Sequence, residues 1–101
     1  MRKTITGALA LALIIAFGPA AAKGGEEVYN TTCAACHATG VAGAPRYGNK
    51  ADWAARAKLG KDALAASVIK GKGAMPPKGG DPKLSDSDVK NAVDHMLKAV
   101  R

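Results

Sequence analysis

The most regular hydrophobic pattern of the chain lies between residues 85 and 101. It opens with Ser85, and Asp88 three residues later gives the spacing of a helix capping box, with Asp where Glu is usual. The apolar residues that follow are spaced as on one face of an α-helix, and they are Val89, Ala92, Val93, Met96, Leu97 and Val100. We therefore predict an amphipathic helix that begins at Ser85 and buries one face.

Three earlier segments are also predicted to be short helices, separated by glycine-containing breaks. Asn49 is the expected N-cap of the second, because its short polar side chain can accept a hydrogen bond from the first turn. The three segments run over residues 25–35, from Asn49 to Gly60 and from Lys61 to Gly71.

Two segments between these helices are predicted to be loops. Residues 38–48 are rich in glycine and proline, and residues 72–82 contain three prolines and three glycines. The second composition excludes both a regular helix and a central strand. No stretch of useful length alternates apolar and polar residues with the period of two that a half-buried strand requires. The pattern therefore predicts an all-α fold with about four short helices.

The first 22 residues have the layout of a bacterial secretory signal peptide. A basic start is followed by an apolar run of ten residues, 8–17, and then by small residues up to Ala22. The alternative is an uncleaved membrane anchor, but a spanning helix needs ~20 apolar residues. We expect cleavage after Ala22 and a periplasmic location for residues 23–101, which form one domain.

The expected mature domain is small and basic. Removal of residues 1–22 takes away two positive charges and no acid, so the formal net charge falls from +7 to +5. A domain of this size buries a modest fraction of its surface and usually needs an additional stabilising element, such as a disulfide or a bound metal. Large apolar side chains are few and alanines are abundant, so we expect something other than side chains to complete the core.

Cys33, Cys36 and His37 are the candidate chemistry of the chain. They are its only cysteines and one of its two histidines. A zinc site needs about four ligands, and His95 is the only further residue of these two types. A thioredoxin-like pair sits at a strand-to-helix junction, and no strand is predicted. A disulfide suits an exported protein but would close a very short loop. The spacing Cys-x-x-Cys-His is the attachment signature of c-type haem, which uses all three residues.

We favour one haem c. Each thiol would form a thioether with one vinyl group of the haem, and His37 would approach the iron from one face. The large apolar ring would also complete the thin core.

The segments around the motif carry a family resemblance. "VYNTTCAACHATGVAGAPRYG" and "GKGAMPPKGG", followed by a capped terminal helix, resemble a class I bacterial cytochrome c and, within that class, the cytochrome c5 group. The resemblance covers residues 25–100. It implies a class I cytochrome c fold, with about four short helices wrapped around one covalently bound haem, and electron transfer as the function.

Met75 is the candidate for the second axial ligand. It lies in the irregular loop between Gly73-Ala74 and Pro76-Pro77, where glycine allows close approach and proline stiffens the backbone. The same loop matches the axial-ligand loop of the family. Met96 is expected to be core, because it lies on the apolar face of the last helix. His95 is the rival ligand, but the resemblance implies that it packs where the first and last helices cross.

The expected surroundings of the haem come mostly from the resemblance. In class I cytochromes the axial histidine donates its other ring N–H to the carbonyl of a proline after the motif, and Pro45 matches that position. Arg46, Tyr47 and Trp53 are candidates to hydrogen-bond the haem propionates. The alternatives are that Trp53 is ordinary core and Arg46 an ordinary surface charge.

A haem with histidine and methionine ligands has no vacant position for a substrate, and no nucleophile–base pair is recognisable. We therefore predict an electron carrier rather than an enzyme. Two alternatives remain open: an electron-transfer subunit of a periplasmic dehydrogenase or oxidase, and a ligand-sensing haem protein.

The predicted partners are redox proteins with acidic docking surfaces. Five lysines lie in or before the Met75 loop, where they would steer an acidic partner if they surround the haem edge; the alternative is that they are scattered solubility charges. They are Lys58, Lys61, Lys70, Lys72 and Lys78. No nucleic-acid binding and no stable membrane insertion are expected. The expected state is a monomer, with a weak dimer as the alternative.

Overall fold

The structure, a computed structural model, describes residues 22–101. The expected signal peptide falls on residues 1–22, of which all but Ala22 lie outside the described part. The described chain is all-α, as predicted, and its one extended pairing is a single bridge between Lys72 and Met75. No helix within residues 22–101 has the length and apolar character needed to cross a membrane.

The first helical stretch is longer than predicted and changes its winding on the way. α1 (Gly25–Val28) passes into a π-helical turn, η1 (Tyr29–Cys33), and then into α2 (Ala34–His37). The Thr31 hydroxyl donates to the carbonyl oxygens of Glu27 at 2.9 Å and Val28 at 3.4 Å, where it competes with the backbone ladder. This side-chain hydrogen bond lies within the widened π-helical turn, which ends at Cys33.

The three later helices agree with the predicted segments. They are α3 (Lys50–Ala57), α4 (Lys61–Lys70) and α5 (Asp86–Lys98). The Asn49 side chain accepts from the Asp52 amide at 2.9 Å, which confirms the predicted cap of α3. The capping box of α5 is also confirmed: the Ser85 hydroxyl accepts from the Asp88 amide and the Asp88 carboxylate accepts from the Ser85 amide, both at 3.0 Å.

The second predicted loop contains a short helical turn that the sequence pattern did not indicate. The turn is η3 (Pro77–Gly80), and a similar turn, η2 (Val41–Gly43), interrupts the first loop. Proline is favourable at the first position of such a turn, because it has no N–H to leave unpaired. Lys78 and Gly79 then take left-handed conformations, so the turn cannot continue as a helix.

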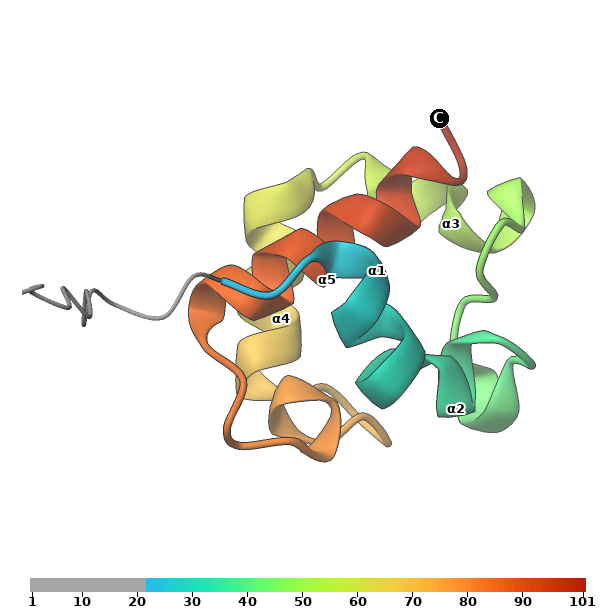
Figure 1. Cartoon of the computed structure of the whole chain (residues 1–101). Helices are drawn as coiled ribbons and strands as arrows, with labels where there is room; N and C mark the ends of the chain where they lie inside the picture. The colour runs from blue at the N-terminus through green and yellow to red at the C-terminus, as the bar shows by residue number, and fades with distance from the viewer. Residues whose placement is uncertain (1–21) are drawn as a thin grey trace, which may run out of the picture.

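The core lies where α1 and α4 pack against α5 (Figure 1). All six residues of the predicted apolar face of α5 contribute, five as buried side chains and Val100 as a partly buried one. Among residues 22–101, Val28 and Val89 are the largest side chains with less than 2 % of their surface exposed. The expectation that a group other than side chains completes the core stays a prediction.

The first and last helices cross in direct contact at Gly25. A Cβ atom at this position would collide with the carbonyl oxygen of Asn91 and would lie 2.9 Å from Cβ of His95. Just before the crossing, the Lys23 amide donates to the Asp88 carboxylate at 2.8 Å, and Asn91 Nδ2 donates to the Lys23 carbonyl at 2.9 Å. The chain that leads into α1 is thereby held along α5.

Gly25→Ala should lower the free energy of unfolding by about 1–3 kcal/mol, because one added methyl group overpacks a backbone contact that cannot yield. Chemical denaturation of both proteins measures the difference. Gly24→Ala is the matched control, since a Cβ there meets nothing within 4 Å. Equal losses in the two variants would contradict the close crossing.

Candidate functional site

The Cys-x-x-Cys-His motif lies on the π-helical turn and α2. Cys33 and His37 are buried, whereas Cys36 is exposed. Residues four apart share a helix face, so the first cysteine and the histidine point inward together. Burial raises the pKa of the Cys33 thiol to about 11. No disulfide joins the two cysteines in this structure; Cys33 is buried and Cys36 is exposed.

The His37 imidazole is oriented by two contacts, and a third contact holds the His37 backbone. Its Nδ1 lies 2.8 Å from the carbonyl oxygen of Pro45, which can only accept. The indole of Trp53 stacks on the imidazole, with ring centroids 6.1 Å apart and an angle of 27°. The Tyr47 amide donates to the His37 carbonyl at 2.7 Å. In the tautomer that donates from Nδ1, Nε2 keeps a free lone pair, which is the form that binds a metal.

Arg46 and Trp53 are held by protein partners. Trp53 Nε1 donates to the carbonyl oxygen of Arg46 at 2.9 Å. The Arg46 guanidinium donates from Nε and Nη2 to the two carboxylate oxygens of Asp52 at 2.7 and 3.1 Å, and its amide donates to the same carboxylate at 3.0 Å. The Trp53 indole N–H and two nitrogens of the Arg46 guanidinium are thus engaged. That Arg46 and Trp53 hydrogen-bond the haem propionates stays a prediction. It would require the same N–H groups to donate to a propionate as well as to their protein partners.

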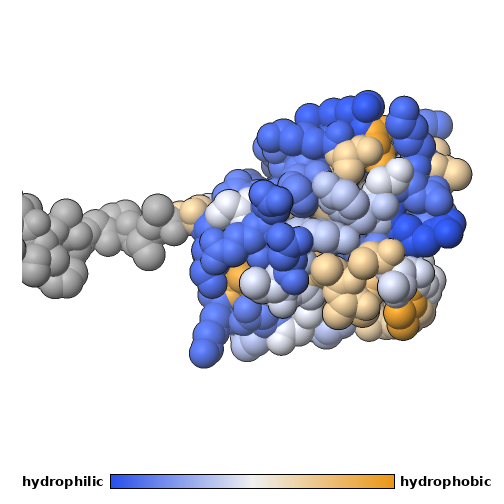
Figure 2. Space-filling model, turned by 45° about the vertical axis from the view of Figure 1, so that its right-hand side comes forward, coloured by the Kyte–Doolittle hydropathy of each residue, from blue (hydrophilic) through white to orange (hydrophobic). Residues whose placement is uncertain are grey.

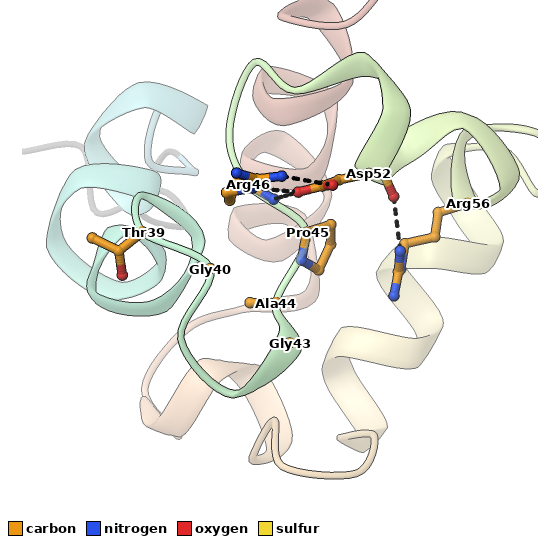
Figure 3. Close-up of a pocket in the computed structure, with 8 residues that line it drawn as sticks. All are labelled: Thr39, Gly40, Gly43, Ala44, Pro45, Arg46, Asp52 and Arg56. Atoms are coloured by element: carbon orange, nitrogen blue, oxygen red, sulfur yellow. Dashed lines mark hydrogen bonds and ion pairs between the residues drawn. The ribbon is translucent and has the colours of Figure 1, made fainter.

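Sequence reasoning missed Asp52. Nothing in its neighbourhood marks it, because its partner lies six residues earlier and meets it only after the chain has turned into α3. The bidentate bond from Arg46 lowers the pKa of the Asp52 carboxyl to about 2. Figure 3 shows the pair from the side of the Pro45 loop, with Arg56 donating to the Asp52 carbonyl at 2.8 Å.

An open hollow of about 380 Å³ lies beside this pair (Figure 3). Neither the cysteines, nor His37, nor Met75 line it, so it is distinct from the face toward which the motif points. The residues that line it are Thr39, Gly40, Gly43, Ala44, Pro45, Arg46, Asp52 and Arg56.

Met75 closes a tight turn after α4. Its amide and carbonyl exchange hydrogen bonds with the carbonyl and amide of Lys72, both at 2.9 Å. Gly71 ends the helix at φ +88°, and a Cβ there would come within 2.9 Å of the Pro77 nitrogen, so this position requires glycine. The Met75 side chain is half-buried.

The Met75 loop lies against the turn that carries Cys33. η3 contacts η1, and a Cβ on Gly79 would lie 3.2 Å from Cγ2 of Thr32. Met96, by contrast, is only 3 % exposed within the core cluster. The turn that follows Met75 therefore contacts the turn that carries Cys33, whereas Met96 lies in the core cluster.

His95 packs at the crossing of the first and last helices, which confirms the expectation. Its ring centroid lies 5.5 Å from that of Tyr29 and 5.4 Å from that of Tyr47, and the two tyrosines are 4.7 Å apart. Tyr47 thus belongs to an aromatic trio that links the loop after the motif to α5. Among residues 22–101, no three His, Cys, Asp or Glu side chains gather as a metal site.

These residues fit a covalently bound haem. Two thiols lie three residues apart on a helical stretch, and the histidine beside them has its ring oriented by a carbonyl. A methionine loop packs against the same stretch.

Comparison with known proteins identifies the family. A family model described as "Cytochrome C oxidase, cbb3-type, subunit III" matches residues 20–96. Cytochrome c-555 from Chlorobaculum thiosulfatiphilum is 48% identical over 80 residues, which cover 75% of this chain and 93% of that protein. Cytochrome c5 from Azotobacter vinelandii is 43% identical over 77 residues, covering 74% and 93%. This chain belongs to that cytochrome c family. It is a small class I member close to the c5 group.

Two solved structures agree with this assignment. A cytochrome c from a crystal structure described as an electron transfer complex with nitrite reductase has a TM-score of 0.74 and 48% identity, covering 76% of this chain and 94% of that one. A mono-haem ferrocytochrome c from Shewanella putrefaciens has a TM-score of 0.68 and 44% identity, covering 78% and 98%. The cofactor of this cytochrome is one haem c, and the protein is an electron carrier rather than an enzyme.

The Asp52 carboxyl of this cytochrome should titrate near pH 2, below its ordinary value of 3.8. Because its pKa is depressed in the folded state, the Arg46–Asp52 pair stabilises the fold fully above about pH 4. That contribution is lost as the pH falls from about 4 through about 2. NMR titration of the carboxyl carbon measures the midpoint. Arg46→Lys should move it upward, since lysine cannot form the bidentate bond; an unchanged midpoint would show that Arg46 is not the cause.

Proposed function

We propose that this cytochrome is a periplasmic carrier of single electrons whose haem is attached through Cys33 and Cys36, with His37 and Met75 as the axial ligands. The observation that carries the proposal is the His37 imidazole. It is 7 % exposed, lies four residues after the buried cysteine and is oriented by the Pro45 carbonyl.

Each of these residues has a definite task. The haem supplies the reversible one-electron chemistry when bound. The Pro45 carbonyl fixes the tautomer and orientation of His37 and raises the basicity of Nε2. Trp53 limits rotation of the imidazole by stacking on it. A thioether sulfur from Met75 would hold the iron together with His37, would raise the reduction potential and would leave no position for a substrate.

The exposed side of the motif is the proposed site of electron exchange. Figure 2 turns the side that carries α2 forward and shows apolar residues gathered on the lower part of that face. Exposed apolar side chains follow one another through and after the motif. They are Ala35, Ala38, Val41 and Ala42.

The proposed partner is a redox protein with an acidic docking surface. The cytochrome c solved in an electron transfer complex with nitrite reductase, at 48% identity, supports a redox protein as the partner. Lys70 and Lys72, which flank the Met75 loop, are exposed and available for steering, as are Lys58 and Lys61. Lys78 differs, because its ammonium donates to the Leu84 carbonyl at 2.7 Å.

We further propose that export is followed by cleavage after Ala22. The Lys23 backbone nitrogen lies 2.8 Å from the Asp88 carboxylate. Cleavage would turn this amide into a charged amino group, which is a stronger donor to the same carboxylate. The processed N-terminus would then be tied to the start of α5.

A subunit of an oxidase complex is the second candidate function, because the matching family model is described as an oxidase subunit. The free carrier is preferred, since this chain covers 93% of the small cytochrome c-555. Stable co-purification with a larger chain from a native membrane extract would favour the subunit.

The absorption spectra of the periplasmically matured protein test the haem and its ligands. We expect a low-spin c-type spectrum with the weak far-red band of methionine-sulfur ligation. Met75→Ala should abolish that band and open the iron to carbon monoxide in the ferrous form. An open site of this kind in the unaltered protein would instead support the ligand-sensing alternative.

Met96→Leu is the matched control for this experiment. It keeps the core filled, so the far-red band should remain and stability should change by less than about 1.5 kcal/mol. An unchanged ferric spectrum in Met75→Ala would refute this ligand. Loss of all covalent haem from the unaltered protein would return the cysteines to the disulfide interpretation.

Electron exchange with an acidic redox partner should slow steeply as salt rises. The Debye length falls from ~30 Å at 0.01 M to ~8 Å at 0.15 M ionic strength, which removes long-range steering. Stopped-flow rates should fall at least several-fold over this range. Lys72→Gln should reduce the salt dependence, whereas Lys98→Gln should not, because Lys98 is on the last turn of α5 and pairs with Asp94. A flat salt response would eliminate the steering mechanism.

A further inference from the structure

The turn that follows Met75 contains an unfavourable backbone conformation. Lys78 has φ 55° and ψ 31°, a left-handed conformation that a Cβ atom disfavours. Glycine would adopt it freely, and glycines occupy the next two positions. The backbone alone therefore does not explain a lysine here.

The side chain of Lys78 supplies the explanation. Its Nζ donates to the carbonyl oxygen of Leu84 at 2.7 Å and lies 3.8 Å from Oδ1 of Asp86. Leu84 is buried, and Asp86 is the first residue of α5. Only 25% of the lysine side chain is exposed, so this ammonium is held inside the fold rather than offered to a partner.

The other side of the same turn faces the haem-attachment helix. Gly79 lies against Thr32 in the π-helical turn that ends at Cys33. The Gly79 amide donates to the Pro76 carbonyl at 3.0 Å, which couples the turn to the segment next to Met75. The turn therefore connects the start of α5, the attachment helix and the methionine loop.

We propose that Lys78 is a positioning residue that ties the Met75 loop to the N-terminus of α5 and so holds the methionine sulfur on the iron. The inference rests on the proposed ligation by Met75. This connection, the hydrogen bond from Lys78 to the Leu84 carbonyl, is called the Lys78 tie. Its loss would increase the fraction of molecules in which the Met75 loop has moved away from the iron, although Met75 itself would still be present.

Imidazole binding to the ferric holoprotein measures that open fraction. The apparent affinity of an added ligand is proportional to the population of the binding-competent state. Lys78→Asn keeps a residue that tolerates the left-handed conformation but cannot reach Leu84. We expect it to bind imidazole about ten-fold more tightly, the effect of losing one hydrogen bond to a charged donor. Its far-red band should disappear at correspondingly lower imidazole concentration.

Two variants distinguish the effect of the Lys78 hydrogen bond from the effects of removing a charge and of lowering the overall stability. Lys78→Arg restores a long cationic donor and should bind imidazole within about three-fold of the unaltered protein. Lys83→Asn removes the same charge from an exposed position five residues later and should have no such effect. Rescue by arginine, together with an inert Lys83→Asn, would support the tie.

Lys78→Gly provides a second test if Lys78→Asn does not accumulate. This variant relieves the left-handed strain and removes the side chain. Tighter imidazole binding would support the proposed role of Lys78. Weaker binding would show that backbone strain has the larger effect and would overturn the proposal. Affinity equal to that of the unaltered protein in both variants would also overturn it. Absence of the far-red band from the unaltered protein would refute Met75 ligation itself, and this inference with it.

Discussion

The direct contact between the first and last helices is the constraint on which the rest of the structure depends. Because Gly25 has no side chain, α1 lies against the Asn91 carbonyl, and this close approach brings Tyr29 beside His95. The crossing also fixes the start of the continuous helical stretch that ends at His37. The crossing therefore positions the attachment motif relative to α5.

Two further connections extend this arrangement to the two proposed ligands. On the histidine side, the Pro45 carbonyl and the Trp53 ring orient the imidazole, and the Tyr47 amide anchors its backbone. On the methionine side, the turn after Met75 touches both the attachment helix and the start of α5. Each ligand is therefore supported by backbone groups from a different loop, which suits a site whose geometry has to stay the same in both oxidation states.

The charges of the chain divide into structural and free ones once the fold is known. Arg46 and Lys78 both look like surface cations in the sequence, yet one is bonded to Asp52 and the other to a buried carbonyl. Lys70 and Lys72 are exposed and remain available to a partner. Counting basic residues around Met75 thus overstates the number that can take part in docking.

The sequence by itself determined the all-α class, the caps of α3 and α5, the buried face of α5 and the attachment motif. These features depend on contacts between residues a few positions apart, so local spacing carries them. Tertiary structure alone decided the left-handed turn after Met75 and the partners of Asp52 and Lys78. Each of these depends on groups that approach only after the chain has turned back on itself, and no local pattern records that approach. The Pro45 carbonyl is intermediate, because family resemblance indicated it and the folded loop supplies the 2.8 Å contact.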